Sequence, residues 1–152
     1  KIKIENAILR METKKYVIAR LPMIFGVNCP RIKEMKDKML EKKPFEVFPN
    51  SIINVNSILK LCQQIHYIIN QGLNGIFHLG SIDLISHYEF FNKLAIHRNF
   101  EKIVFKQVFT MNELRYIAVL PKEKKLPSHL NITCDEVLSD SHTDKLKDGK
   151  SI

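Results

Sequence analysis

Apolar residues recur along the chain at two periods, which predict an alternation of helices and short strands. Helical spacing occurs in four segments: about residues 1–12, a charged segment entered at Pro30, residues 57–70, and a segment that begins at Ser86. Strand patterns occur in four others: about residues 15–20, 45–48, 75–80 and 102–108. Residues 111–120 fit either a helix or a strand. This alternation predicts an α/β or mixed arrangement with some parallel strand pairing.

Local capping residues mark the two most regular helices. Asn56 and Ser57 are both candidate caps for the helix over 57–70, and Gly72 can end it. Ser86 and Glu89 have the spacing of a capping box at the start of the next helix. The strand over 15–20 is short and apolar, and its composition predicts burial on both faces.

Length and composition predict one domain followed by a tail. A chain of 152 residues with 45% hydrophobic content can bury a core, which we expect within residues 1–138. Residues 139–152 are polar and charged, which predicts a disordered tail.

The first helix has no capping residue before it, so we expect the natural start to lie upstream. The apolar runs are too short for a membrane span or a signal peptide, and we expect a cytoplasmic protein.

The basic balance of the chain bears on its partners. The formal net charge of +8 favours polyanions such as nucleic acid. Much of the excess, however, lies in residues 33–43, where acidic residues are interleaved, and in the tail. Such runs are typical of solvated surfaces. A basic nucleic-acid-binding domain is therefore the hypothesis that we rank last, and it predicts salt-sensitive binding.

Cysteines and histidines give no pattern of a metal or disulfide site. The three cysteines are an odd number without Cys-x-x-Cys spacing, so we expect reduced thiols, with Cys29 beside Pro30 the most accessible. None of the six histidines pairs at i, i+4, and we expect no metal site. His78, in an apolar strand, is typical of a hydrogen-bonded core residue, whereas His87 opens a helix and is compatible with an exposed side chain.

Four segments occur in a characteristic order: Lys1 to Glu5, then Arg20-Leu-Pro-Met-Ile-Phe-Gly26, then Gly75-Ile-Phe-His-Leu-Gly80, then Ile85-Ser-His-Tyr-Glu-Phe90. This order resembles the extended short-chain dehydrogenases/reductases, most nearly the dTDP-4-dehydrorhamnose reductase group, over about residues 1–100. The resemblance implies the C-terminal part of a Rossmann-like α/β fold with its smaller substrate-binding lobe.

The resemblance also implies roles for particular residues. In that family a Tyr-x-x-x-Lys pair is catalytic, and Lys1 matches its lysine, so the tyrosine would lie four residues before Lys1. A neighbouring ammonium lowers the pKa of a tyrosine hydroxyl from its ordinary value of about 10, which eases proton exchange with a substrate oxygen. Leu21, Pro22 and Met23 would pass beside the cofactor, and Arg20 is the implied substrate-binding residue.

One departure from the family concerns the cofactor. None of the five glycines falls in the Gly-x-x-Gly-x-x-Gly turn that holds a dinucleotide pyrophosphate. We therefore expect NAD or NADP to serve the full-length parent, and this chain alone to bind neither and to be inactive. A missing N-terminal Rossmann half is the implied partner, and a homo-oligomer is a further one that we consider.

Two related functions follow from the resemblance. The first is the substrate-side portion of an NAD(P)-dependent nucleotide-sugar reductase or epimerase, an oxidoreductase whose substrate is a nucleotide sugar. The alternative is a non-catalytic nucleotide-sugar-binding or regulatory relative of the same fold. Residues 49–56 motivate the alternative, because they differ from the segment that relatives carry before the helix over 57–70.

Overall fold

The computed structural model describes residues 2–13, 15–100, 102–109, 112–120 and 126–140. The helices are α1 (Ile2–Leu9), α2 (Pro30–Leu40), α3 (Ile58–Asn70), α4 (His87–His97) and α5 (Cys134–Asp140), with one 3₁₀ turn, η1 (Ser128–Leu130). The strands are β1 (Val17–Arg20), β2 (Met23–Phe25), β3 (Phe45–Val47), β4 (Ser51–Ile53), β5 (Val55–Ser57), β6 (Gly75–His78), β7 (Ile85–Ser86), β8 (Phe105–Gln107) and β9 (Arg115–Ile117).

Most strand pairing is parallel. Strand β1 pairs with β6, β2 with β5, β3 with β8 and β4 with β9 in parallel, whereas β4 and β7 are antiparallel. Parallel neighbours need a crossover connection, and the chain between each pair contains at least one helix. The structure therefore confirms an α/β fold with parallel pairing, and the ambiguous segment over 111–120 contains a strand, β9.

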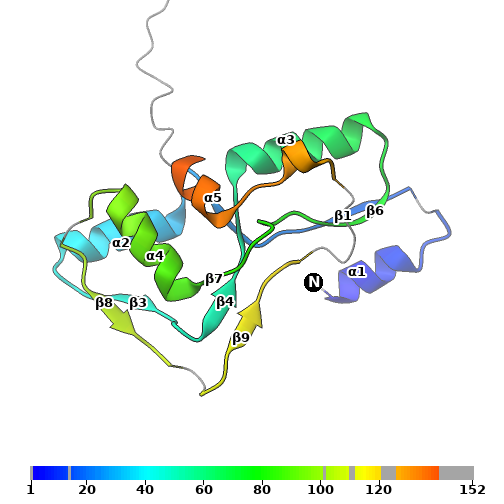
Figure 1. The fold of residues 1–152 in the computed structure, drawn as a ribbon. Helices are drawn as coiled ribbons and strands as arrows, with labels where there is room; N and C mark the ends of the chain where they lie inside the picture. The colour runs from blue at the N-terminus through cyan, green and yellow to red at the C-terminus, as the bar shows by residue number, and fades with distance from the viewer. Residues whose placement is uncertain (1, 14, 101, 110–111, 121–125, 141–152) are drawn as a thin grey trace, which may run out of the picture.

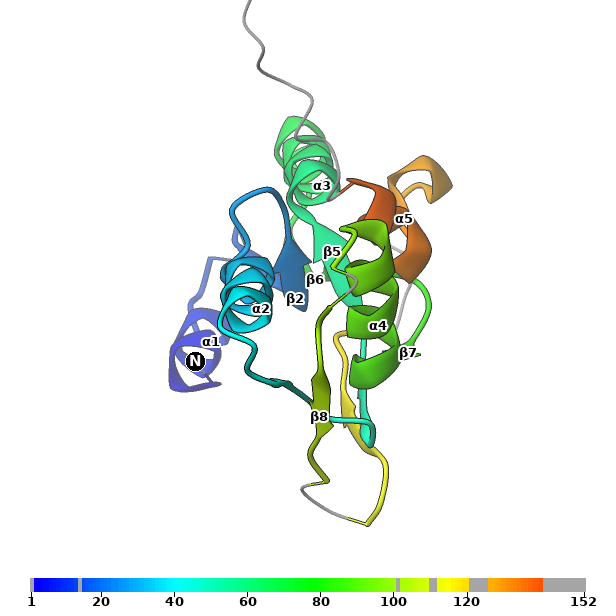
Figure 2. The same cartoon turned by 90° about the vertical axis from the view of Figure 1, so that its left-hand side faces the viewer.

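Aromatic side chains from α4 and the strands form the main core. The Phe25 and Phe90 rings lie 4.7 Å apart, and the Phe45 and Phe91 rings 5.1 Å apart. All four are buried, together with Met35 of α2. Helices α2 and α4 overlap in the view of Figure 1 and stand apart on either side of β8 in Figure 2. A smaller cluster beneath α3 contains four buried residues: Leu61, Ile68, Phe77 and Leu79.

The predicted caps are confirmed. The Ser57 hydroxyl accepts a hydrogen bond from the Lys60 amide at 3.1 Å, and the Ser86 hydroxyl accepts one from the Glu89 amide at 3.1 Å. Gly72 follows α3 with a φ of +59°, in the left-handed region that favours glycine. Local polar chemistry therefore decides where α3 and α4 begin and where α3 ends.

The prediction that the strand over 15–20 is buried on both faces is wrong. Three of the four residues of β1 are exposed, and its one paired neighbour among the described strands is β6. Helix α1 has no buried residue, and Figure 1 shows α1 and α3 on opposite sides of the β1–β6 pair. Parallel strands are normally covered on both faces. The apolar composition of β1 is typical of a strand packed on both faces, but no described segment buries its exposed apolar side chains.

This exposed region predicts self-association of the chain. The Ile2 and Ile4 side chains of α1 are 74% and 67% exposed. Large apolar side chains left exposed in this way promote contact between copies. We expect the apparent size in size-exclusion chromatography to rise with concentration, and the double substitution Ile2→Glu, Ile4→Glu to reduce that rise. A sharp monomer peak at every concentration would contradict the prediction.

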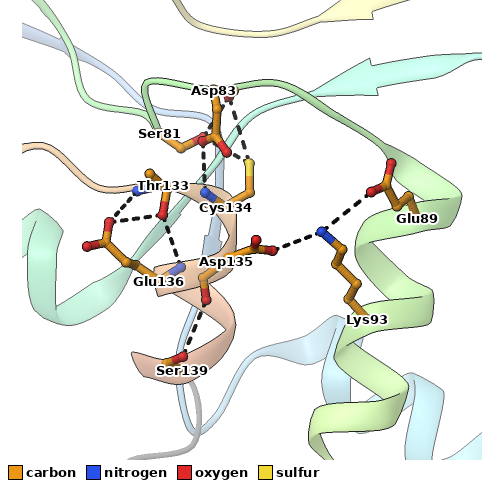
Figure 3. Close-up of polar contacts among 9 residues, drawn as sticks. All are labelled: Ser81, Asp83, Glu89, Lys93, Thr133, Cys134, Asp135, Glu136 and Ser139. Atoms are coloured by element: carbon orange, nitrogen blue, oxygen red, sulfur yellow. Dashed lines mark hydrogen bonds and ion pairs between the residues drawn. The ribbon is translucent and has the colours of Figure 1, made fainter.

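Helix α5 is an element that the sequence patterns did not predict. Thr133 and Glu136 form a reciprocal capping box, in which the Thr133 amide donates to Glu136 Oε2 at 2.7 Å and the Glu136 amide donates to Thr133 Oγ1 at 3.2 Å (Figure 3). The Cys134 amide donates to Asp83 Oδ1 at 2.8 Å, and Lys93 Nζ lies 3.0 Å from Asp135 Oδ1. These contacts hold α5 against α4 and the loop after β6.

The last described residues of the chain belong to α5. Helix α5 continues through Asp140, whose Oδ2 accepts a hydrogen bond from the Ser57 hydroxyl at 2.7 Å. Ser57 therefore joins the start of α3 to the end of α5. The rest of the predicted tail, residues 141–152, lies outside the described residues.

Gly80 lies against the Asn54 side chain, and this contact predicts the result of a substitution. A Cβ at Gly80 would collide with Asn54 Nδ2, which donates to the carbonyls of Ser81 at 3.2 Å and Val119 at 3.0 Å. A buried amide that loses its partners costs about 1–3 kcal/mol. We expect Gly80→Ala to lower the free energy of unfolding by about 2 kcal/mol in urea titrations. Gln63→Ala, at an exposed position of α3, is the control, and equal losses in both variants would contradict this account.

Candidate functional site

A pocket of about 570 Å³ opens where β1 passes into β2. Eight of its lining residues are apolar: Leu21, Pro22, Met23, Phe48, Ile53, Ile117, Ala118 and Val119. Its polar lining consists of Arg31, Ser51, Asn54, His87 and Tyr116. A mostly apolar pocket with a few placed polar groups is typical of small-molecule sites. The three residues that the sequence analysis placed beside the cofactor, Leu21, Pro22 and Met23, all line this pocket.

A change of strand partner places Leu21 and Pro22 at the pocket. Strand β1 ends at Arg20, which is in register with His78 of β6, while β2 begins at Met23, in register with Val55 of β5. The two residues between the strands belong to neither ladder, and Pro22 has no amide hydrogen to donate. In open α/β sheets, ligands bind beyond the carboxyl ends of strands. The end of β1 is such a position.

Arg31 is the one charged side chain among the described residues that line the pocket. It follows Pro30 in the first turn of α2, and its guanidinium lies 4.6 Å from the centre of the Phe45 ring. Its Nη1 donates to Glu34 Oε2 at 2.6 Å. The aromatic ring and the carboxylate hold the guanidinium in place, and a planar guanidinium can bind a phosphate or carboxylate with two hydrogen bonds.

His87 is buried at the pocket wall, so the expectation of an exposed His87 side chain is wrong. Its ring packs 4.6 Å from the Phe91 ring and 5.2 Å from the Phe48 ring. The Phe48 amide donates to His87 Nδ1 at 3.3 Å. Burial and, secondarily, the charge of Arg31 lower the pKa of His87 from 6.5 to about 4. His87 is therefore uncharged at neutral pH, and its proton is on Nε2.

The lowered pKa of His87 predicts a dependence of stability on pH. Between pH 6.5 and about 4 the unfolded chain binds a proton at His87 that the folded chain does not, so stability falls as the pH falls. The full difference is on the order of 3 kcal/mol. We expect an NMR titration of the His87 ring to have its midpoint near 4, and His87→Phe to lose more stability at pH 7 than at pH 4. A midpoint near 6.5 would contradict this result.

Asn54 holds in place the segment Tyr116 to Val119, which lines one side of the pocket. Its Oδ1 accepts a hydrogen bond from the Val119 amide at 2.9 Å, and its Nδ2 donates to the Val119 carbonyl at 3.0 Å. This two-point contact ties the segment after β9 to the corner between β4 and β5. Tyr116 of β9 lines the pocket and is 65% exposed. An exposed aromatic ring at this position can pack against a flat ligand group.

Of the other two predicted site residues, only Arg20 belongs to the described part of the chain. Arg20 is outside the residues that line the pocket, and its Nη2 lies 2.8 Å from Glu5 Oε1. Its Nη1 lies 3.1 Å from His78 Nε2, so Arg20 connects α1, β1 and β6. His78 is half-buried and hydrogen-bonded, as expected. The predicted substrate contact of Arg20 stays a prediction, and Lys1 lies outside the described residues.

The cysteines differ from expectation in exposure. Cys29 is buried, so the prediction that it is the most accessible thiol is wrong; the exposed one is Cys62. Cys29 precedes α2, and its Sγ lies 3.7 Å from the Ile24 carbonyl. Burial raises the pKa of Cys134 to about 12, which leaves it protonated at neutral pH.

The described part of the chain contains no group of histidine, cysteine and acidic residues suited to a metal ion. No described helix is long and apolar enough to span a bilayer.

Comparison with known proteins reveals a shared fold. The dTDP-4-dehydrorhamnose reductase from Bacillus anthracis str. Ames, solved in complex with NADP, matches with a TM-score of 0.73 at 20% identity, over 90% of this chain and 50% of that one. The Yersinia enterocolitica dTDP-4-dehydrorhamnose reductase matches with a TM-score of 0.61 at 14% identity, over 82% and 48% of the two chains. This chain has the fold of part of these enzymes.

The fold is also shared with an epimerase, whereas the sequence comparisons find no match. The UDP-glucuronic acid 4-epimerase from Bacillus cereus, solved in complex with NAD, matches with a TM-score of 0.60 at 17% identity, over 84% of this chain and 43% of that one. The matches confirm the predicted fold class, the Rossmann-like α/β fold of extended short-chain dehydrogenases. The chain spans about half the length of these structures. No protein-family model and no curated protein sequence matches it.

Proposed function

We propose that the chain is the substrate-side portion of an NAD(P)-dependent nucleotide-sugar reductase of the dTDP-4-dehydrorhamnose reductase type, or of a related epimerase. The observation that carries the proposal is the pocket at the end of β1. It brings the segment expected beside the cofactor, Leu21 to Met23, together with one cation, Arg31, in a mostly apolar site. The fold shared with reductases and an epimerase supports the same function.

Each part of the pocket suits one part of the expected ligands. Leu21, Pro22 and Met23 offer an apolar wall for a nicotinamide ring, which would supply the hydride when the cofactor is bound. Arg31 offers the charge that a nucleotide diphosphate needs. The sequence contains no glycine turn for the dinucleotide pyrophosphate, so the chain fits only the nicotinamide end of the cofactor.

Lys1 would act through a tyrosine upstream of the chain. A tyrosine four residues before Lys1 would give a proton to the carbonyl oxygen of the sugar, and the ammonium of Lys1 would lower the pKa of that tyrosine. Arg20 would hold α1 against β1 through its ion pair with Glu5. A substrate contact for Arg20 remains part of the proposal.

The test is an activity measurement on the chain extended by its upstream coding sequence. We expect that sequence to encode a glycine turn and the tyrosine, and the extended protein to oxidise NADPH or NADH when given a dTDP-4-keto-6-deoxy sugar. Lys1→Met should lower kcat strongly, whereas Lys36→Gln, exposed on α2, should not. An upstream sequence without both features would contradict the proposal.

A non-catalytic relative of the same fold is the second candidate, and residues 49–56 favour it. The Asn56 amide nitrogen donates to Gln64 Oε1 at 2.8 Å and to the Leu79 carbonyl at 2.9 Å. The Asn54 amide is bound to Ser81 and Val119. Neither amide is free to contact a nucleotide phosphate. This candidate predicts that the extended protein binds a dinucleotide without turning over any nucleotide sugar.

A further inference from the structure

Ser51 and His87 lie across from each other at the end of the β4–β7 pair. The antiparallel register matches Ile53 with Ile85 and Ile52 with Ser86, so the next position sets Ser51 opposite His87. Both side chains line the pocket at the end of β1. Ser51 is 6% exposed and His87 is 5% exposed.

Each of these buried side chains has a polar atom without a partner in the described part of the chain. His87 Nδ1 accepts from the Phe48 amide, which leaves the Nε2 hydrogen without an acceptor among the described residues. The Ser51 hydroxyl also has no hydrogen-bond partner there. Buried polar groups in proteins are nearly always hydrogen-bonded to protein or water. Neither Ser51 Oγ nor His87 Nε2 is a fully buried atom, so both reach the pocket, where the hydroxyl of a ligand can replace water as their partner.

The chemistry of the pair selects the kind of ligand group. An uncharged imidazole offers one donor at Nε2, and a serine hydroxyl offers a donor and an acceptor. This combination suits hydroxyl oxygens, which both donate and accept, better than an anion. The positive charge that would attract an anionic group of the ligand comes from Arg31, which lines the same pocket. The guanidinium of Arg31 and the ring of His87 both pack on Phe91, so the cation lies close to the uncharged polar pair.

We propose that His87 Nε2 and Ser51 Oγ bind hydroxyl oxygens of the sugar in a nucleotide sugar and so determine which sugar the site accepts. The inference rests on the proposed function, because it places the sugar of that substrate in this pocket. Specificity arises because a sugar that lacks the matching hydroxyl displaces water from these two polar atoms without replacing its hydrogen bonds, which a binding site penalises strongly.

The test compares binding of dTDP-glucose and of dTDP to the 152-residue chain by calorimetry. We expect dTDP-glucose to bind more tightly than dTDP. Ser51→Ala and His87→Phe should each weaken dTDP-glucose binding by about 2- to 12-fold, the range for one lost hydrogen bond, and leave dTDP binding unchanged. Lys36→Gln is the control. The His87 Nε2 proton signal should also shift when dTDP-glucose is added, which a purely structural histidine would not show.

The outcomes separate this inference from the proposed function. If the wild-type chain binds neither probe, both are overturned. If it binds dTDP-glucose no more tightly than dTDP, or if both variants bind dTDP-glucose like the wild type, this inference alone is overturned. Ser51→Ala keeps the test decisive if His87→Phe fails to fold, because it removes only an oxygen atom.

Discussion

Replacing Arg31 with glutamine is expected to weaken binding of dTDP-glucose to the chain by about 10- to 100-fold. Arg31 is the one charged side chain among the described residues of the pocket, so no other group there can take over its interaction with a diphosphate. Hydrogen bonds to charged groups contribute about 1.5–3 kcal/mol, which corresponds to this range. Calorimetric titration of both proteins measures the effect, and it should affect dTDP as much as dTDP-glucose.

Two further variants separate charge from geometry in the Arg31 experiment. Arg31→Lys keeps the charge but loses the planar group that stacks on Phe45, and we expect an intermediate affinity. Lys36→Gln removes a charge from the exposed face of α2 and should leave the affinity unchanged. Equal weakening by Lys36→Gln and Arg31→Gln would mean that only the overall charge matters, which contradicts a specific role for Arg31.

Replacing Phe91 with alanine is expected to lower the free energy of unfolding by about 3–5 kcal/mol. Its ring is fully buried and packs against Phe45 at 5.1 Å, Phe90 at 5.8 Å and His87 at 4.6 Å. Removal of a buried aromatic ring costs both the transfer free energy and that of the cavity left behind. Because a domain of this size is stable by only about 5–15 kcal/mol, urea should unfold the variant at a much lower concentration.

Ile96→Ala on the same helix is the matched control for Phe91→Ala. The Ile96 side chain is 68% exposed and contributes little to the core, so we expect a change within about 0.5 kcal/mol. The same experiment bears on the pocket, since the His87 ring packs on Phe91 and should become more accessible without it. We expect the pKa of His87 in Phe91→Ala to rise toward 6.5. Similar losses of stability in both variants would contradict the assignment of the core.

The sequence predicted the elements whose ends depend on local chemistry. Ser57 and Ser86 cap α3 and α4 through hydrogen bonds to amides three residues ahead, and such signals can be seen in any short window of sequence. Thr133 and Glu136 carry the same signal for α5, but it was not used, and no element was predicted for residues 128–138. Strands β4, β5 and β9 have three residues each and exist through pairing with distant segments, which no local pattern reports.

The pocket was only partly predictable for the same reason. Leu21 to Met23 followed from a resemblance in the order of segments, and these residues do line the pocket. Arg31 and His87 come from the first turns of α2 and α4, and only the fold brings them together. His87 also illustrates how burial changes chemistry, because a histidine at the start of a helix is often exposed, whereas this one is enclosed by Phe48 and Phe91.

The most direct test of the central claim, that this pocket binds a nucleotide sugar, is an NMR titration of the ¹⁵N-labelled chain with dTDP-glucose. We predict saturable shifts of the amide signals of Leu21, Met23, Arg31 and Tyr116, with little change along the outer face of α3. Absence of shifts at millimolar ligand, or shifts confined to the surface around Lys60, Tyr67 and His129, where a second pocket lies, would contradict the claim.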